Sequence, residues 1–190
     1  MGDLEITGDS LTSASLANVE ELQGSLIVNN ASKLNDFHAD SLKKVTDTLS
    51  LQKLYILSAA SFGALEEVDT IQFITLPAIS TFTTNLKSAN IIYVSDTALE
   101  TVNAFTSLQK VASFNMNNNK GLGNLESDLE TVSDSLEFSS NGNDANVTFD
   151  KLIWANNITI RDVESASFTN LESVNQSLGF INNSISTLNL

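Results

Sequence analysis

The sequence has no cysteine, and it has one proline, one histidine and one arginine among 190 residues. Without cysteine there is no disulfide and no thiolate metal site, but the compartment stays open because secreted proteins can also lack disulfides. His38 is the one candidate base for a histidine-dependent catalytic triad. The scarcity of proline suits a backbone whose N–H groups are needed for strand ladders.

Long apolar runs and an excess of positive charge are also missing. No stretch of 18 or more apolar residues occurs, so none could span a bilayer as a helix. The opening residues, MGDLEITGDS, show no signal peptide, because no basic segment precedes an apolar one. The 23 acidic and 9 basic residues give a formal charge of −14, which disfavours nucleic acids and anionic membranes as partners.

An internal repeat is the strongest positive signal. The phrase LETVSDSLEFSSN at residues 129–141 returns as LESVNQSLGFINN at residues 171–183. Its opening pattern, L-x-x-V with Ala allowed for Val, recurs with a period near 22 residues. The eight units begin at Leu16, Leu42, Leu65, Leu86, Leu108, Leu129, Leu152 and Leu171.

Each unit is followed by two apolar residues that alternate with polar ones, which is typical of a short strand with one buried face. The pairs are Leu26/Val28, Leu49/Leu51, Ile71/Phe73, Ile92/Val94, Phe114/Met116, Leu136/Phe138, Ile158/Ile160 and Leu178/Phe180. The pattern predicts an all-β fold, a right-handed parallel β-helix or leucine-rich-repeat-like solenoid of about eight coils. The ten phenylalanines fall into two columns of this repeat, which predicts aromatic stacks at a constant level of the core.

Asparagine is abundant, and three asparagines lie five residues after the first apolar residue of a strand pair. For Asn119, Asn141 and Asn183 we favour a structural role, in which the amide satisfies backbone groups at a turn. Five N-x-S/T sequons are candidate N-glycosylation sites if the chain is secreted, although their number is what composition alone would give. They are Asn30, Asn146, Asn157, Asn175 and Asn182.

The sequence offers few candidate catalytic residues. The pairs Glu20/Glu21 and Glu66/Glu67 lie in or beside the variable positions of the L-x-x-V units, where we expect a solvated face. Trp154 occupies a similar position and could stack on a sugar or cover a neighbouring coil. No catalytic, cofactor-binding or metal-binding residue is predicted.

Three phrases carry a resemblance to a known family. SDTALETVNAF at residues 95–105, NMNNNKGL at residues 115–122 and LIWANNITIRDV at residues 152–163 resemble fungal GPI-anchored cell-wall proteins. This is the extracellular-mutant and sporulation-specific family, built on receptor-L-domain-like leucine-rich repeats. The resemblance implies a secreted, glycosylated, non-enzymatic protein of the cell wall and outer plasma membrane, with glycans at the five sequons and no cofactor.

The sequence departs from that family in lacking a secretion signal, cysteines near the ends and a GPI-attachment tail. We therefore expect residues 1–190 to be one solenoid domain, an internal fragment without terminal caps. Any membrane attachment would come from a GPI anchor that this chain does not contain.

Three functions fit these features. The one we favour is a structural cell-surface protein that supports cell-wall organisation, with wall polysaccharide or wall and membrane proteins as partners. The alternative is an extracellular binding module that recognises a glycan or protein on one solenoid face. A β-helix carbohydrate enzyme would need convergent carboxylates in a groove.

Overall fold

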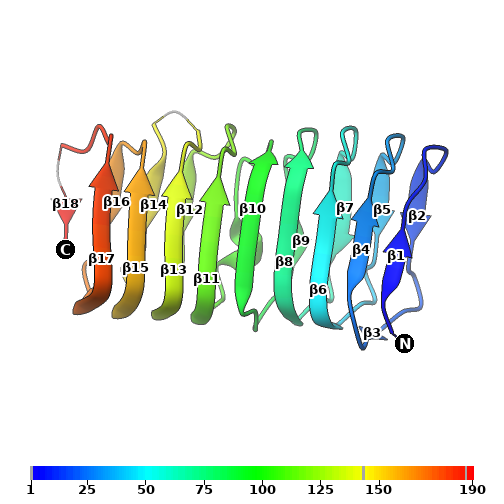
Figure 1. Ribbon diagram of the computed structural model, residues 1–190, viewed down its shortest axis with the longest axis horizontal. Helices are drawn as coiled ribbons and strands as arrows, with labels where there is room; N and C mark the ends of the chain where they lie inside the picture. Colours follow the sequence, from blue (N-terminus) through cyan, green and yellow to red (C-terminus); the bar gives the residue numbers. More distant parts are fainter. Residues whose placement is uncertain (1, 143, 187) are drawn as a thin grey trace.

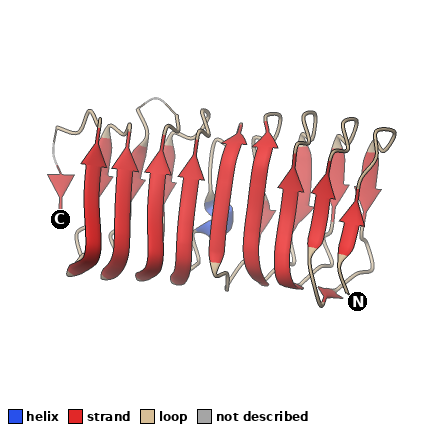
Figure 2. Ribbon diagram, in the orientation of Figure 1, coloured by secondary structure: helices blue, strands red, loops and turns tan. Residues whose placement is uncertain are grey.

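The computed structural model describes residues 2–142, 144–186 and 188–190, which form parallel strands and one short 3₁₀ helix, η1 (Asn103–Phe105). Figures 1 and 2 show the strands stacked side by side in two layers, with η1 in the rear layer. The long front sheet has the order β1 (Leu4–Ile6), β4 (Leu26–Asn29), β6 (Lys44–Gln52), β8 (Glu67–Leu76), β10 (Ile91–Thr97), β11 (Lys110–Asn117), β13 (Thr131–Ser139), β15 (Trp154–Arg161) and β17 (Ser173–Ile181), with β3 (Glu21–Leu22) paired to β6.

The rear layer consists of two four-stranded sheets on either side of η1. The first contains β2 (Ser13–Ser15), β5 (Asp36–His38), β7 (Ala59–Phe62) and β9 (Thr83–Thr84). The second contains β12 (Asn124–Glu126), β14 (Asn146–Thr148), β16 (Ser165–Ser167) and β18 (Leu188–Asn189). No helix among the described residues has the length and apolar character needed to cross a membrane.

The parallel pairing confirms the predicted β-solenoid, because each strand pairs with its equivalent one coil later. The register aligns the predicted apolar pairs, for example Ile71 with Ile92 and Phe73 with Val94. These side chains point inward and are buried from β4 to β15. In β17, the last strand of the front sheet, Leu178 is instead 41% exposed because no described coil covers that side.

The predicted position of the first repeat unit is wrong by three residues. The pattern placed it at Leu16 and Val19, but Leu22 is the residue that pairs with Val45 of the next unit. Leu22 is fully buried, and the unit therefore runs from Val19 to Leu22. In this unit the order of the two residues is reversed, with Val19 first and Leu22 second. The L-x-x-V pattern therefore matched Leu16 and Val19 instead. With the corrected register, Leu26 follows Leu22 at the same interval as Leu49 follows Val45.

The predicted aromatic column is also more irregular than expected in the N-terminal half. Phe37 pairs in register with Ala60, whereas Phe62 pairs with Thr84. The rings of Phe37, Phe62 and Phe82 therefore alternate between two neighbouring inward positions, with a smaller residue at the other one. Successive ring centroids lie 5.6 and 5.5 Å apart. Since coils repeat every ~4.8 Å, this alternation of large and small side chains lets the rings fill the core without crowding.

The series of aromatic contacts continues through the C-terminal half, where one of the rings comes from a strand of the front sheet. Phe149 and Phe168 stack with centroids 5.4 Å apart and planes inclined by 16°. The coil between Phe105 and Phe149 has no rear phenylalanine, and Phe114 of β11 fills the gap, 6.3 Å from each of them. One chain of contacting rings thus runs through the core from Phe37 to Phe180.

The three asparagines at this repeat position, buried at Asn119 and Asn141 and half-buried at Asn183, make the backbone hydrogen bonds that the sequence predicted. Asn119 is fully buried, and its Oδ1 accepts hydrogen bonds from the backbone N–H and Oγ1–H of Thr97, at 3.2 and 2.7 Å. Its Nδ2 donates to the carbonyl oxygen of Val94 at 3.1 Å. Asn141 and Asn183 make equivalent bonds one and three coils later. These amides are occupied by the backbone, so their role is structural.

Candidate functional site

The outer surface of the middle strands of the front sheet is the first candidate site, which we name the central face. It consists of the outward side chains in residues 48–52 of β6, 70–74 of β8, 91–95 of β10 and 113–117 of β11. They are Thr48, Ser50, Gln52, Thr70, Gln72, Ile74, Ile91, Tyr93, Ser95, Ser113, Asn115 and Asn117. None of them is charged, although the chain carries a formal charge of −14.

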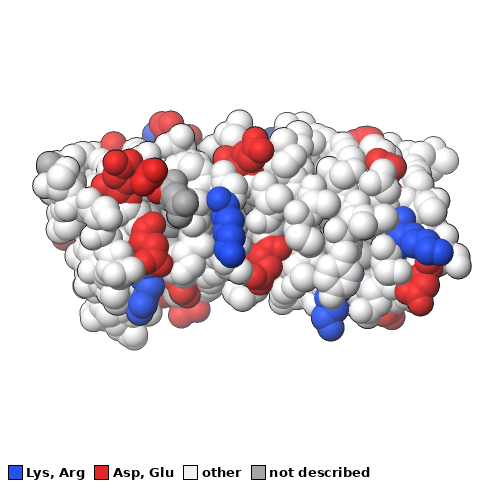
Figure 3. Space-filling view, turned by 90° about the horizontal axis from the view of Figure 1, so that it is seen from above, with Lys and Arg blue, Asp and Glu red and all other residues white. Residues whose placement is uncertain are grey.

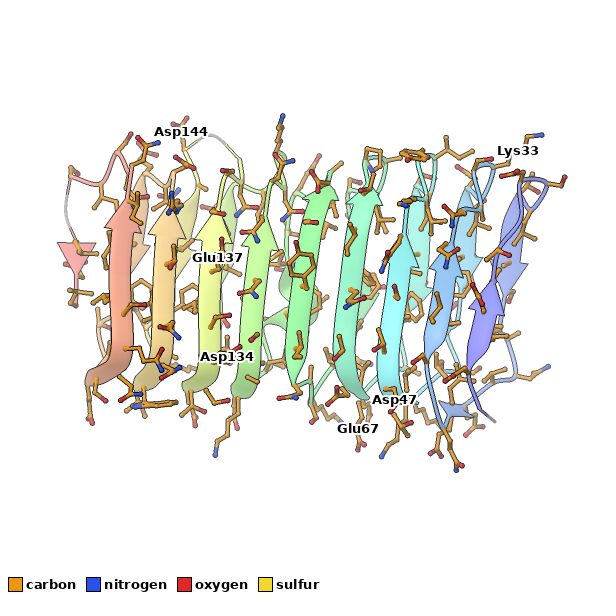
Figure 4. All side chains as sticks on the ribbon, viewed as in Figure 1. Lys33, Asp47, Glu67, Asp134, Glu137 and Asp144 are labelled. Carbon is orange, nitrogen blue, oxygen red and sulfur yellow. The ribbon has the colours of Figure 1, made fainter. Side chains whose placement is uncertain are left out.

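The same strands carry charged residues before these stretches, namely Lys44, Asp47, Glu67, Asp69 and Lys110. Charged outward residues border this surface: Figure 4 labels Asp47 and Glu67 below it and Glu137 on β13 beside it. Asp134 of β13, also labelled, accepts a hydrogen bond from Ser113 Oγ–H at 2.9 Å.

The amide side chains of the central face each use one end on a neighbour. The Nε2 of Gln52 donates to Oε1 of Gln72 at 3.3 Å, and Ser135 Oγ–H donates to Oδ1 of Asn115 at 3.2 Å. Ser139 Oγ–H donates to Oδ1 of Asn117 at 2.7 Å. Within the described residues no hydrogen bond uses the other end of Gln72, Asn115 or Asn117. These three amides therefore present free polar groups to the solvent.

A groove runs along the lower margin of the central face, where the long strands bend. The register shifts at this bend, between Val45 and Thr48 of β6 and again at the equivalent points of β11 and β13. The groove, which we name the bend groove, has a volume of about 700 Å³ and crosses the coils from Lys44 to Ser133. Its floor contains valine and alanine, and its walls carry Ser, Thr, Asn and both signs of charge.

Below the bend, the variable positions of the repeat units form a ladder of ion pairs between coils. Lys43 Nζ lies 2.8 Å from Glu20 Oε2, and Lys87 Nζ lies 2.9 Å from Glu66 Oε1. In the neighbouring column, Lys44 Nζ lies 2.7 Å from Glu67 Oε2. The expected solvated acidic face is thus a solvated face in which both signs alternate. The sequence contains the signal, since glutamate and lysine alternate at the repeat period.

The ion pairs shift the pKa values of Glu20, Lys43 and Lys44. The hydrogen bond from Lys43, together with its charge, lowers the pKa of Glu20, and Glu20 in turn raises the pKa of Lys43. Glu67 raises the pKa of Lys44 by the same two effects. The contribution of Glu20 to stability is present above the ordinary carboxyl pKa of about 4.3 and is lost as the pH falls through the lowered value. The lysine contributions are present below about pH 10.4 and are lost as the pH rises through the raised values.

Reversing the charge of Lys43 should destabilise the protein in a salt-dependent way. Lys43→Glu puts three glutamates in successive coils at this position, so we expect a lower unfolding midpoint in low salt. The difference from the wild type should shrink in high salt, because exposed charges are screened over about 8–10 Å near physiological ionic strength. Thermal melts at two salt concentrations measure this.

Lys33→Glu is the matched control, because it makes the same charge change at an exposed position that forms no ion pair within the described residues. Figure 4 shows Lys33 at the upper edge, away from the ladder. Equal loss in the two variants would mean that net charge, and not the ladder, decides the effect.

Comparison with known proteins identifies relatives of the whole chain. It is 59% identical over 189 residues to the cell wall mannoprotein PST1 of Saccharomyces cerevisiae, covering 100% of this chain and 42% of the relative. It is 35% identical over 167 residues to the cell surface GPI-anchored protein ECM33 of Candida albicans, covering 86% of this chain and 40% of the relative. Sporulation-specific protein 2 of S. cerevisiae is 35% identical over 196 residues, covering 100% of this chain and 38% of the relative. The chain belongs to this fungal ECM33 and sporulation-specific protein family.

The predicted family resemblance is thereby confirmed. The chain spans less than half the length of each of these ECM33-family relatives. No protein-family model matches it. No solved structure matches it either.

The structure places the five sequons of this ECM33-family chain toward its two ends. Asn30 and Asn182 are exposed, with φ of 50° and 55°, in the turns that leave β4 and β17. Asn175 is exposed on β17, whereas Asn146 on β14 and Asn157 on β15 are half-buried.

The two exposed turn sequons belong to a column of left-handed turns along the upper edge, which Figure 3 views from above. The members share a φ between 50° and 59° and end successive front strands. They are Asn30, Lys53, Thr75, Asp96, Asn118, Ser140, Asp162 and Asn182. Asparagine and aspartate tolerate this conformation better than most residues, which explains part of the polar character of the edge.

The aromatic residues that could stack on a sugar do not form a row. Trp154 is half-buried at the start of β15, beside Thr131 and Ser173 in the register. Tyr55 is 54% exposed in the turn region after β6, and Tyr93 is half-buried on the central face. The use of Trp154 as a sugar platform stays a prediction. No motif in the sequence marks the central face, and its one signal is that outward positions 48–52, 70–74, 91–95 and 113–117 carry no charge.

Proposed function

We propose that this chain is the solenoid part of a non-enzymatic fungal cell-surface protein that supports cell-wall organisation. The observation that carries the proposal is the 59% identity to a cell wall mannoprotein over the whole chain. A rigid, closely packed solenoid suits such a role, because it presents long, regular faces without needing to change shape. The association would be with wall polysaccharide or with other wall and membrane proteins.

The absence of catalysis is part of the proposal, and the placement of the acidic side chains supports it. The carboxylates of Glu20, Glu66 and Glu67 are engaged by lysines on neighbouring coils. Asp150 accepts hydrogen bonds from Ser167 Oγ–H at 2.6 Å and the Thr169 backbone N–H at 3.1 Å, which lower its pKa. A glycosidase acid needs a raised pKa and a second carboxylate nearby, so these groups are unsuited to that chemistry.

Fractionation of the native host tests the location. We expect an immunoblot to find the protein in the wall or membrane fraction, and N-glycosidase treatment to reduce its apparent mass. Asn30→Gln and Asn182→Gln should each reduce the glycosidase-sensitive shift, because both side chains are exposed at the upper edge. Asn29→Gln is the matched control, since it changes the neighbouring asparagine without removing a sequon.

A glycosidase-insensitive protein confined to the cytosol would contradict the proposed function. It would separate the fold from the role that the relatives' names suggest. The solenoid would then be better explained as an intracellular binding module.

A further inference from the structure

We propose that the central face binds an extended neutral polysaccharide that lies along the solenoid axis. This inference rests on the proposed place of the chain at the fungal surface, where such a polymer would be within reach. Four properties of the face support it: its lack of charge, its free amide groups, its adjoining groove and the absence of sequons from its four strands.

The lack of charge selects the chemical class of the ligand. The protein as a whole repels anions, and the central face itself provides no cation to bind one, since Lys44 and Lys110 lie before it on β6 and β11. A neutral polymer pays no electrostatic penalty at such a surface. Its hydroxyl groups can accept and donate hydrogen bonds. The half-buried polar groups of the central face, among them Gln72, Tyr93 and Asn115, can pair with them. Four other residues of the face are instead buried, namely Ser50, Thr70, Ser95 and Ser113.

One row of the central face combines the groups that recognise a sugar. Gln72, Tyr93 and Asn115 lie side by side on β8, β10 and β11, because each of the outer two pairs with Tyr93 in the register. The two amides each keep one end free of hydrogen bonds within the described residues, as shown above. The half-buried ring of Tyr93 offers an apolar body and a polar hydroxyl between them. Ile74 and Ile91 add apolar surface for the C–H groups of a sugar ring.

The direction of the proposed ligand follows from the repeat. Equivalent side chains recur every ~4.8 Å along the axis, so a polymer with its own short repeat can make similar contacts on successive coils. The bend groove runs in the same direction below the face, from Lys44 to Ser133, with a volume of about 700 Å³. A chain in contact with the face can place substituents in this groove, where Ser88 and Asn90 are available.

The four strands of the central face contain no sequon. No sequon occurs between Asn30 and Asn146, a stretch that contains all four strands of the central face. Two acceptors flank this region: Asn30, in the turn after β4, which is next to β6, and Asn157, on the front sheet two strands beyond β11. If the sequons carry glycans, as in a mannoprotein, the central face remains accessible between them.

Sedimentation with insoluble polysaccharides tests the proposal with the full 190-residue chain after N-glycosidase treatment. The probes are an insoluble neutral β-linked glucan and chitin, with a soluble anionic polysaccharide as a competitor. We expect retention on at least one neutral polymer, no displacement by the anionic one, and less than about a twofold change between low and high salt. Tyr93→Ala should weaken binding about tenfold, the loss expected for one aromatic contact.

Matched variants separate the face from general effects on folding. Tyr55→Ala removes the other tyrosine, which is 54% exposed away from the face, and should bind like the wild type. Asn115→Asp keeps the shape of the side chain but removes its N–H donors, and should weaken binding. Asn103→Asp makes the same change at an exposed asparagine of η1 in the rear layer, outside the sequons, and should not. Circular dichroism melts verify that each variant is folded.

Several outcomes would overturn the inference. These are failure of the wild type to sediment with either neutral polymer, loss of retention in high salt, and equal weakening by Tyr93→Ala and Tyr55→Ala. A concentration-dependent dimer that Tyr93→Ala abolishes would assign the face to a second copy of the chain. Because the assay uses purified protein, a cytosolic location in the host would contradict the proposed function and leave this result unaffected.

Discussion

Replacing Phe105 with alanine is expected to lower the free energy of unfolding by about 3–5 kcal/mol, because it removes a buried ring and leaves a cavity. Phe105 is 1% exposed, and its ring lies 6.2 Å from that of Phe82 and 6.3 Å from that of Phe114. It therefore joins the aromatic group of the N-terminal half to that of the C-terminal half. Urea unfolding followed by circular dichroism gives the free-energy difference.

Two controls show whether position in the core decides the cost. Phe180→Ala removes the same side chain from the last front strand, where the ring is only partly buried, and should cost clearly less. Glu100→Gln changes an exposed side chain and should cost under about 0.5 kcal/mol. Similar losses in all three variants would show that burial in the core does not decide the cost.

The fold follows closely from the sequence because one physical rule is repeated in every coil. An inward side chain at a given position of the coil must be apolar in every repeat. The apolar pairs from Leu49/Leu51 to Ile158/Ile160 can therefore be aligned from the sequence alone. The rule fails where two residues exchange roles within it, as Val19 and Leu22 do. It also fails to place the rings of Phe37, Phe62 and Phe82, because either of two neighbouring inward positions satisfies burial.

The candidate site is harder to predict, because it is defined by contacts between coils. Glu20 and Lys43 are 23 residues apart, and their ion pair requires the corrected register of the first unit. The row of Gln72, Tyr93 and Asn115 likewise requires the pairing of β8, β10 and β11. No local motif marks such rows, whereas sequons are local motifs and can be found without a structure.

Removing the side chain of Asn119 should be the second large effect. Asn119→Ala takes partners away from the Thr97 backbone N–H and the Val94 carbonyl oxygen, both of which belong to buried residues. Each buried group left without a partner costs about 1–3 kcal/mol, so we expect a loss of roughly 2–5 kcal/mol in the free energy of unfolding. Asn119→Leu should fare no better, because an apolar side chain of similar size fills the space but pairs neither group.

The same column of the solenoid supplies a matched control for this prediction. Asn183 makes the equivalent bonds to Val163 N–H and the Ile160 carbonyl oxygen, at 3.0 and 3.1 Å, but it is partly exposed on the last coil. Water can replace its amide there, so Asn183→Ala should cost about 1 kcal/mol. Equal costs at Asn119 and Asn183 would mean that burial does not determine how much these asparagines contribute to the free energy of unfolding. Two earlier coils have Leu54 and Leu76 at this position and therefore lack the amide. A negligible cost at Asn119 would show that the C-terminal coils are likewise stable without it.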